Sequence, residues 1–228
     1  MVNLSESELI EKWNKSSLKI PKDKSVSDYA IDKEVLFPRN CTVVDLGGGT
    51  GTDALYFAEK GHRVILIDIA ETALDIAKQK ARDINLEIET HQVVLGNTPI
   101  PLEDNSVDIV YSRLAIHYFN QQTTSDILKE IHRILKQGGT AYISVKSPND
   151  TAEMEFLKKT ASEIDTNVFV DEGYIKSRYT LSQWESFIKP LGCSEFKVHD
   201  YIEDLTGRVD AVKSGNKSFV LTEIILRK

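Results

Sequence analysis

Short runs of β-branched and apolar residues alternate with stretches of helical periodicity between residues 41 and 146. The short runs are TVVDL, RVILID, EIETHQVVL, VDIVYS and TAYISV, and the stretches between them include DALYFAEKG, AETALDIAKQKARD and SDILKEIHRILKQGG. The first pattern is typical of strands and the second of amphipathic helices. Strands that alternate with helices require right-handed crossovers, so the pattern predicts a doubly wound, Rossmann-like α/β core with a mostly parallel sheet.

Glycines mark two expected helix ends in this core. Gly61 follows a charged helical stretch, and Gly138 and Gly139 follow Lys136. Because glycine readily adopts the left-handed conformation that ends many helices, we expect each helix to stop there, just before the next strand.

The chain after the core adds a helical stretch near residues 151–164 and a second helix, LSQWESFIKPLG. Two strand-like runs follow, SEFKVHDYI and KSFVLTEIILRK, joined by a turn-rich stretch that contains Gly207 and Gly215. Runs so close in sequence favour an antiparallel pair. The predicted sheet therefore has seven strands, with this antiparallel C-terminal pair at its edge.

We expect residues 1–228 to form a single domain in four segments. Residues 1–40, helical and charged, form an N-terminal lid, and residues 41–146 form the core. Residues 147–180 form a cap over a substrate, and residues 181–228 supply the last helix and strands. The aromatic residues of the cap are the candidates to line an apolar site or to pack the cap onto the sheet; they are Phe156, Phe169, Tyr174 and Tyr179.

The composition is that of a soluble protein. The chain is 41% hydrophobic and 28% charged, and no apolar run approaches the roughly 18 residues of a membrane span. Its N-terminus has early acids and no apolar core of a secretory signal. Cys41 and Cys193 lack partners at ligand spacing, which is typical of reduced thiols in a cytoplasmic protein, although one disulfide is also compatible.

The charge of the chain disfavours a nucleic-acid partner. A net charge of −7 repels phosphate backbones on average, so binding would need a local basic patch. The nearest candidate, NKSSLKIPKDK, is interrupted by Asp23, and we interpret it as a solvated segment. Histidines and carboxylates do not cluster at ligand spacing, so we expect no metal site; His62 and His91 are interpreted as structural.

A glycine-rich turn follows the first strand in the sequence VVDLGGGTGTDAL, residues 43–55. Open parallel sheets bind ligands at the carboxyl ends of their strands, and this stretch is such an end. A P-loop needs a lysine, which the stretch lacks. A dinucleotide loop that starts at Gly47 needs its third glycine at position 52, where Thr52 stands, and the glycine comes one residue early at Gly51.

Asp45 decides between the remaining ligands. A carboxylate beside the N-terminus of a helix repels a diphosphate, by on the order of 1–4 kcal/mol at a separation of a few ångströms. The acid therefore favours a cationic ligand. S-adenosylmethionine is such a ligand, because it carries a sulfonium and an ammonium and no phosphate.

The motifs resemble those of the class I S-adenosylmethionine-dependent methyltransferases. VVDLGGGTGTDAL and VILIDIA resemble the first two motifs of this family, and PIPLEDNSVDIVYSRLAIHYF resembles the third and fourth. The resemblance covers about residues 41–146, keeps the order and spacing of the motifs, and is closest to members that methylate small molecules.

The resemblance implies a cofactor site around the first two strands. Asp45 and the loop of Gly47, Gly49 and Gly51 would contact the methionine portion, where glycine allows the backbone to approach. Asp68, followed by Ile69, stands where the family has the carboxylate that binds the ribose hydroxyls. Asp68 also begins a D-x-x-E sequence, so a capping box for the next helix is the alternative.

Further candidates follow the third and fourth strands. Asn97 stands, in a segment one residue shorter than the family pattern, where the family meets adenine, and it is either a contact or a turn residue. The backbone near Ser112 and Arg113 resembles the segment that meets the methionyl amine. His117 and Tyr118 could face the substrate, with His117 as a general base. Packing inside its short segment is the alternative for His117.

Asp108 lies within the fourth predicted strand, and we interpret it as a structural anchor.

The sequence as a whole predicts transfer of a methyl group from S-adenosylmethionine to a small-molecule nucleophile. A protein or nucleic-acid methyltransferase is the first alternative, although YSRLAIHYF lacks the Asn/Asp-Pro-Pro-Tyr/Phe stretch of amino-methylating members and the net charge disfavours polynucleotides. A non-catalytic cofactor-binding module is the second alternative to a small-molecule methyltransferase. A dehydrogenase is the weakest alternative.

Overall fold

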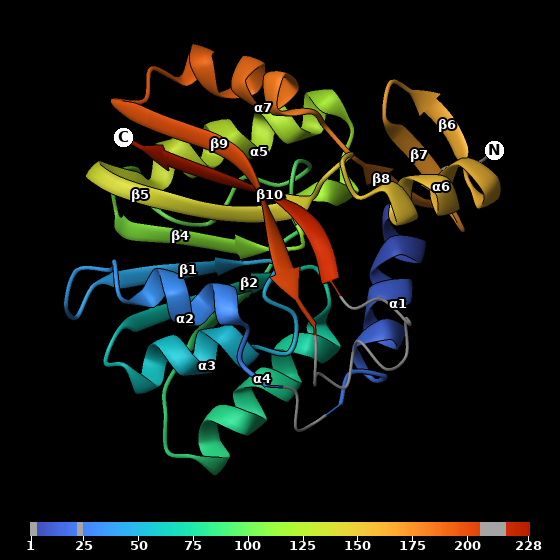
Figure 1. The fold of residues 1–228 in the computed structure, drawn as a ribbon. Helices are drawn as coiled ribbons and strands as arrows, with labels where there is room; N and C mark the ends of the chain where they lie inside the picture. Colours follow the sequence, from blue (N-terminus) through green and yellow to red (C-terminus); the bar gives the residue numbers. More distant parts are fainter. Residues whose placement is uncertain (1–3, 22–24, 206–217) are drawn as a thin grey trace.

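The computed structural model describes residues 4–21, 25–205 and 218–228, and its centre is a seven-stranded sheet (Figure 1). The strand order is β3-β2-β1-β4-β5-β10-β9. The five strands β1 to β5 pair in parallel, and β10 pairs antiparallel with both β5 and β9. The strand bounds are β1 Thr42–Leu46, β2 Arg63–Asp68, β3 Glu89–Gln92, β4 Val107–Arg113, β5 Leu135–Lys146, β9 Glu195–Asp204 and β10 Ser218–Arg227.

This architecture confirms the predicted doubly wound sheet and its antiparallel C-terminal pair. The strand order reverses between β1 and β4, which is where such sheets bind ligands. The stretch with Gly207 and Gly215 that joins the last pair lies outside the described residues.

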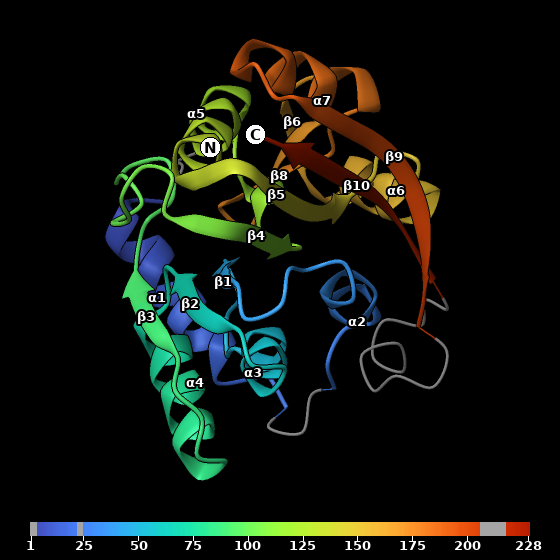
Figure 2. The ribbon, with the colours of Figure 1, turned by 90° about the vertical axis from the view of Figure 1, so that its left-hand side faces the viewer.

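Helices cover both faces of the sheet (Figure 2). Strand side chains alternate between faces, so Val44 packs with the helices α5 and α7 while Val43 packs with α2, α3 and α4. The helix bounds are α1 Glu6–Ser17, α2 Asp28–Glu34, α3 Thr52–Glu59, α4 Glu71–Asp83, α5 Gln121–Ile134, α6 Thr151–Thr160 and α7 Leu181–Ile188, with short 3₁₀ turns η1 Ile116–Tyr118 and η2 Lys189–Leu191. In the described part of the chain, no helix is long and apolar enough to cross a bilayer.

A small three-stranded antiparallel sheet follows α6, where the sequence predicted only helix near residues 151–164. Its strands are β6 Ser162–Asp165, β7 Val168–Asp171 and β8 Tyr174–Ser177. The turn between β7 and β8 places Glu172 and Gly173 at φ +50° and +84°, as a tight hairpin turn requires. Because glutamate is an unusual residue in such a turn, the hairpin has little local signature in the sequence.

The glycines at 138 and 139 do not end a helix, so that prediction was wrong. α5 already ends at Ile134, and the chain enters β5 directly at Leu135. The register against β4 shifts between Val107 and Ile109, so the glycines lie in an irregular part of the strand, as in a β-bulge. The expected stop at Gly61 is confirmed, since α3 ends at Glu59 and Gly61 has φ +88°.

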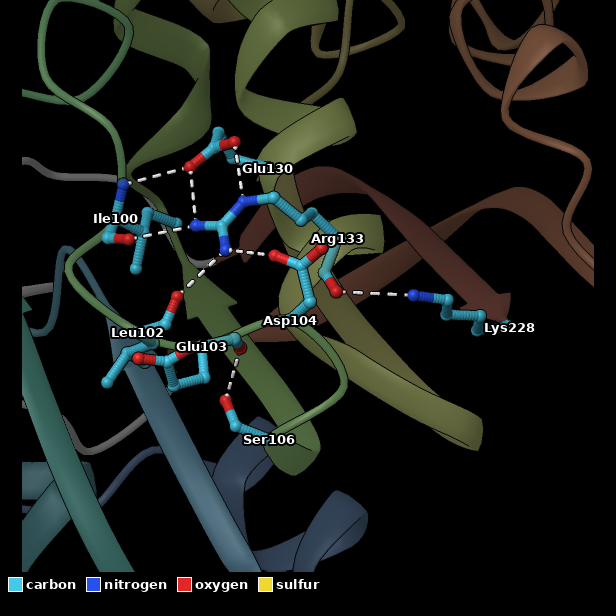
Figure 3. A network of polar contacts seen from close by, with 8 residues as sticks. All are labelled: Ile100, Leu102, Glu103, Asp104, Ser106, Glu130, Arg133 and Lys228. Carbon is cyan, nitrogen blue, oxygen red and sulfur yellow. Dashed lines mark hydrogen bonds and ion pairs between the residues drawn. The ribbon is translucent and has the colours of Figure 1, made fainter.

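Arg133, near the end of α5, holds the loop that enters β4 (Figure 3). Its guanidinium donates to the carbonyls of Ile100 and Leu102 at 2.9 and 2.8 Å and to the carboxylates of Glu130 and Asp104. Glu130 in turn accepts from the backbone N–H of Ile100. These bonds fix the segment between β3 and β4, and therefore the starting point of the central strand β4.

Asp108 confirms its predicted role as a structural anchor. Its carboxylate accepts from the backbone N–H of Thr42 at 2.9 Å and from the ammonium of Lys136 at 2.8 Å. The residue thus ties β4 to the beginnings of β1 and β5.

Candidate active site

A cavity of about 580 Å³ lies at the carboxyl ends of β1, β2 and β4 and is also lined by residues of α1. This volume is within the range of pockets that hold small organic ligands. The strand ends and the turns that follow them form its floor, and α1 with the turn between β7 and β8 forms its roof.

The first wall is the end of β1 with its glycine turn. Asp45 is buried and borders the cavity together with Gly47, Gly48 and Gly49. A Cβ at Gly48 would lie 2.2 Å from the Asp45 carboxylate, so this position accepts only glycine. A Cβ at Gly49, by contrast, would meet nothing within 4 Å, which leaves open space for a ligand above the loop. The sequence reading omitted Gly48, although the GGG triplet was visible.

Gly51 lies behind this loop and does not border the cavity. It precedes α3 at φ +73°, and a Cβ there would lie 2.8 Å from the Cβ of Ala77 in α4. The structure therefore gives Gly51 a packing role between two helices, while a direct contact with a cofactor stays a prediction. Its neighbours Thr50 and Thr52 do border the cavity.

Asp68 projects from the end of β2 into the same cavity, next to Ile69. One carboxylate oxygen accepts from the backbone N–H of Gly49 and the other from that of Ala70, both at 2.8 Å. Burial raises the pKa of this carboxyl despite these bonds. The alternative of a capping box is wrong, because the N-cap of α4 is Ala70 and no side chain caps that helix.

These residues fit S-adenosylmethionine better than a dinucleotide. A carboxylate oxygen can accept more than one hydrogen bond, so both oxygens of Asp68 retain capacity for the two hydroxyls of a ribose. Asp45, which lies beside the glycine loop, would repel a diphosphate placed there, whereas it would attract a cation. Within the described ranges, Arg113 is the one basic side chain that borders the cavity.

Asn97 borders the cavity beyond the end of β3. Its amide N–H₂ donates to Glu6 of α1 at 2.9 Å, so the side chain also holds the roof. The neighbouring Val93 and Leu95 supply an apolar surface suited to a flat base. The geometry thus brings Asn97 to the site, and a bond to adenine stays a prediction.

Ser112 and Arg113, at the end of β4, have different surroundings. Ser112 is fully buried, does not border the cavity, and donates to the carbonyl of Leu46 at 2.8 Å, which links β4 to β1. Arg113 borders the cavity, and its guanidinium donates to both carboxylate oxygens of Glu203 at 2.6 and 2.7 Å. Burial lowers the pKa of Arg113, but Glu203, Tyr111 and Asp53 together more than offset this effect and raise the pKa.

His117 and Tyr118 are neighbours in η1 that face different surroundings. His117 is buried and does not border the cavity. Burial, with the nearby cations Arg178 and Lys146, keeps its pKa well below the usual value. Tyr118 does border the cavity, and burial raises its pKa. The structure therefore favours packing for His117 and a wall position for Tyr118.

A buried polar cluster that the sequence reading missed forms the wall between α2 and β4. The carboxylate of Asp53 accepts from the backbone and hydroxyl of Ser27 at 2.9 and 2.7 Å and from the hydroxyl of Tyr111 at 2.8 Å. All three residues border the cavity. Asp53 followed the glycine loop directly in sequence, but nothing there indicated that Ser27, 26 residues earlier, would bind it.

Leu114 was also missed and follows β4 at the edge of the cavity. Its φ of +56° is left-handed, a conformation that costs a leucine about 1–3 kcal/mol and that tends to occur at functional sites. No residue type in the sequence announces such a turn.

The roof joins α1 to the cap. The Trp13 ring of α1 lies 5.0 Å from the Tyr118 ring and 5.2 Å from the Tyr174 ring of β8, measured between centroids. Of the four aromatic residues proposed for the cap, Tyr174 borders the cavity. The other three do not: Phe169 and Tyr179 are buried elsewhere, and Phe156 is exposed on α6.

A second arrangement with a catalytic appearance lies away from the cavity. The Cys41 thiol is 3.3 Å from one ring nitrogen of His62, whose other nitrogen is 3.3 Å from Glu34. Burial, with Asp108, raises the pKa of Cys41 to about 11, so the thiol is not a reactive thiolate. Across the described residues, His, Cys, Asp and Glu form no group of three that could bind a metal.

The comparisons with known proteins agree with this geometry. Residues 43–139 match the family model described as a methyltransferase domain. Over 130 residues, or 57% of the chain, the sequence is 32% identical to the biotin biosynthesis bifunctional protein BioHC of Cellvibrio japonicus, and this match covers 24% of that protein. Over 101 residues, or 42% of the chain, it is 35% identical to the ubiquinone/menaquinone biosynthesis C-methyltransferase UbiE of Vibrio vulnificus, covering 38% of it.

The fold extends the likeness over almost the whole chain. The structure superposes with a TM-score of 0.69 on the 1,6-didemethyltoxoflavin-N1-methyltransferase of Burkholderia thailandensis, at 15% identity, covering 98% of this chain and 86% of that one. The sequence matches are shorter, since the chain spans about a quarter and two fifths of these two curated relatives. Residues 43–139 therefore match a methyltransferase domain, and the strand order of the whole sheet agrees with the fold of that solved methyltransferase.

Proposed function

We propose that the protein binds S-adenosylmethionine in the cavity and transfers its methyl group to a small molecule, releasing S-adenosylhomocysteine. The observation that carries the proposal is the Asp68 carboxylate, which borders the cavity and accepts from the glycine loop through Gly49. The glycine loop has no lysine and lies between the buried Asp45 and the partly buried Asp68, which suits a cationic nucleoside and opposes a diphosphate.

The names of related proteins support a small methyl acceptor. UbiE of Vibrio vulnificus acts in ubiquinone and menaquinone biosynthesis, and the Burkholderia thailandensis structure holds 1,6-didemethyltoxoflavin and S-adenosylhomocysteine. The net charge of −7 also opposes a nucleic-acid substrate. A cytoplasmic location is part of the same proposal.

Bound S-adenosylmethionine supplies an activated methyl group: a lone pair of the acceptor bonds to the methyl carbon while the carbon–sulfur bond breaks, and sulfur keeps that electron pair. The protein's task is to place the acceptor in line with this bond and to exclude water. Such positioning can supply roughly 7–11 kcal/mol. Asp45, the glycine loop and Asp68 would hold the cofactor, and residues 147–180 with α1 would close over the acceptor.

A screen for S-adenosylhomocysteine release in the presence of S-adenosylmethionine and a panel of small nucleophiles tests the activity. We expect release with at least one nucleophile and its loss in Asp68→Ala. Asp126→Asn is the matched control, because Asp126 lies on α5 and does not border the cavity. Cofactor binding without release from any nucleophile would contradict the enzymatic proposal and favour a non-catalytic binding module.

A further inference from the structure

The cavity has two chemically different halves. The half at the ends of β1 and β2 is polar and contains Asp45 and Asp68. The other half is formed by α1, the turn after β4 and the β7–β8 hairpin, and aromatic and aliphatic side chains dominate it; they include Trp13, Leu114, Tyr118, Phe119, Tyr174 and Ile175. If the polar half holds the cofactor, as proposed above, the apolar half remains for the methyl acceptor.

Three rings in the apolar half form one continuous wall, which we define as the aromatic wall: Trp13, Tyr118 and Tyr174. The Trp13 ring lies 5.0 and 5.2 Å from the other two, which are themselves 6.3 Å apart. The rings come from three elements that are distant in sequence, α1, η1 and β8. All three are half-buried and border the cavity, so their surfaces remain available to a ligand.

The charges around the cavity limit what can bind there. Among the described residues that border it, the charged side chains are Asp45, Asp53, Asp68 and Arg113. Arg113 is bonded to Glu203, and Asp53 to Ser27 and Tyr111. An anionic acceptor would therefore meet three acids and a single cation, Arg113, that already has a carboxylate partner, and an unpaired charge is costly to bury.

A cationic acceptor is disfavoured for another reason. It would have to approach the positive sulfonium of the proposed cofactor, and like charges at a few ångströms repel. The ammonium of Lys12 does not border the cavity, but it lies 4.3 Å from the centre of the Tyr174 ring, donates to the carbonyl of Glu172, and adds positive charge next to the aromatic wall.

We propose that the aromatic wall selects an uncharged, planar methyl acceptor, an aromatic or conjugated compound that stacks on Trp13, Tyr118 and Tyr174. Aromatic rings favour offset-stacked and edge-to-face contacts with flat ligands, and tyrosine hydroxyls can add a hydrogen bond at the ligand's edge. The proposal rests on the proposed function for the identity of the neighbouring cofactor.

Three naphthalenes of the same size and different charge test this class: 2-naphthamide, 2-naphthoate and 2-naphthylmethylammonium. Each is titrated by calorimetry into the protein saturated with S-adenosylhomocysteine, so that binding is measured without turnover. We expect the uncharged amide to bind at least about tenfold more tightly than either ion. Stronger or equal binding of an ion would overturn the proposal.

Variants locate the probe. Tyr174→Ala should weaken binding of 2-naphthamide by about tenfold, Trp13→Phe should retain most of it, and Phe156→Ala should leave it unchanged. Phe156 is the matched control because it belongs to the same cap but is 54% exposed on α6 and does not border the cavity. Thermal unfolding of each variant shows whether it is folded. Equal binding by the Tyr174 and Phe156 variants would refute a role for the wall.

The two proposals fail in different ways. If S-adenosylhomocysteine itself does not bind, the proposed cofactor is wrong. If it binds and the naphthalenes do not, the cofactor stands and the aromatic wall has only a packing role.

Discussion

Single residues at the strand ends carry most of the chemistry. The sequence indicated Asp45, Asp68 and the glycine turn as site residues because ligands bind at the carboxyl ends of parallel strands. At such an end a carboxylate can bind the ligand, and glycine allows the backbone to approach it. The sequence indicated nothing of Ser27 or Leu114. Ser27 contacts Asp53 only in the folded chain, and Leu114 has a left-handed backbone conformation that leucine rarely adopts. Neither residue is therefore marked by a local pattern in the sequence.

His117 provides the first prediction. We expect His117→Asn to keep the methyl-transfer rate within about threefold of wild type with the same pH dependence, because the imidazole is buried away from the cavity and the removal of a true base costs roughly 10²–10⁴. Steady-state rates between pH 6 and 9 measure this. A loss of that larger size, together with the loss of the limb near neutrality, would restore the base hypothesis.

Asp68 gives a prediction on pH. Burial raises its pKa, so the carboxyl becomes protonated at a higher pH than an exposed aspartate does. A protonated carboxyl has fewer acceptor sites for a ribose. Affinity for S-adenosylhomocysteine should therefore be constant near neutrality and fall as the pH drops through this raised pKa. Calorimetry at several pH values should show the fall in wild type and a flatter profile in Asp68→Asn, and identical profiles would contradict the assignment.

At the scale of elements, the regular parts of the chain could be predicted and the irregular parts could not. β1 and β2 have the predicted bounds, because buried parallel strands are continuous apolar runs. The β7–β8 hairpin was missed because its turn uses Glu172 in place of the asparagine or aspartate that usually marks one. Gly138 and Gly139 were wrongly predicted to end a helix, because glycine is also common at an irregularity in a strand such as the one in β5.

The loop before β4 depends on Arg133. Arg133→Lys keeps the positive charge but loses most of the donors that hold the carbonyls of Ile100 and Leu102, so we expect the free energy of unfolding to fall by about 1–3 kcal/mol. Urea unfolding measures the change. Asp104→Asn is the control and should cost much less, because Asp104 is 68% exposed and exposed ion pairs contribute little. Equal losses in both variants would contradict this account.

The cap is held by charges between α6 and the chain beside β5 and β8. Glu153 of α6 pairs with Arg178 and Lys146. Burial opposes the charged form of Glu153, but the two cations outweigh it and lower its pKa below the usual 4.5. A lowered pKa means that this carboxylate stabilises the fold above the unfolded-state pKa and that the stabilisation is lost as the pH falls through the folded-state value.

Glu153→Gln should therefore destabilise the protein at pH 7 by about 1–2 kcal/mol, less than for a fully buried pair because the Glu153 side chain is 20% exposed. The difference from wild type should shrink as the pH falls through the lowered pKa of Glu153 and the carboxylate becomes protonated. Urea unfolding over a series of pH values from 7 downward checks this. A difference that does not depend on pH would show that the carboxylate's charge is not what matters.

For the whole molecule, the doubly wound sheet brings three distant parts of the chain to one cavity. The ends of β1 and β2 bring the acids, the turn after β4 brings Tyr118, and α1 and β8 cover them with Trp13 and Tyr174. The core of this arrangement followed from the sequence because the motifs are local. The sequence also predicted a roof from the N-terminal lid and the cap, but not the contact between Trp13 of α1 and Tyr174 of β8, because that contact depends on tertiary packing.

The most direct measurement is a calorimetric titration of S-adenosylhomocysteine and of NAD into the wild-type protein and Asp68→Ala. We expect S-adenosylhomocysteine to bind at a single site and NAD not to bind. Asp68→Ala should weaken S-adenosylhomocysteine by about 10- to 150-fold, the equivalent of about 1.5–3 kcal/mol for hydrogen bonds to a charged group. Tight binding of NAD with no binding of S-adenosylhomocysteine would contradict the account.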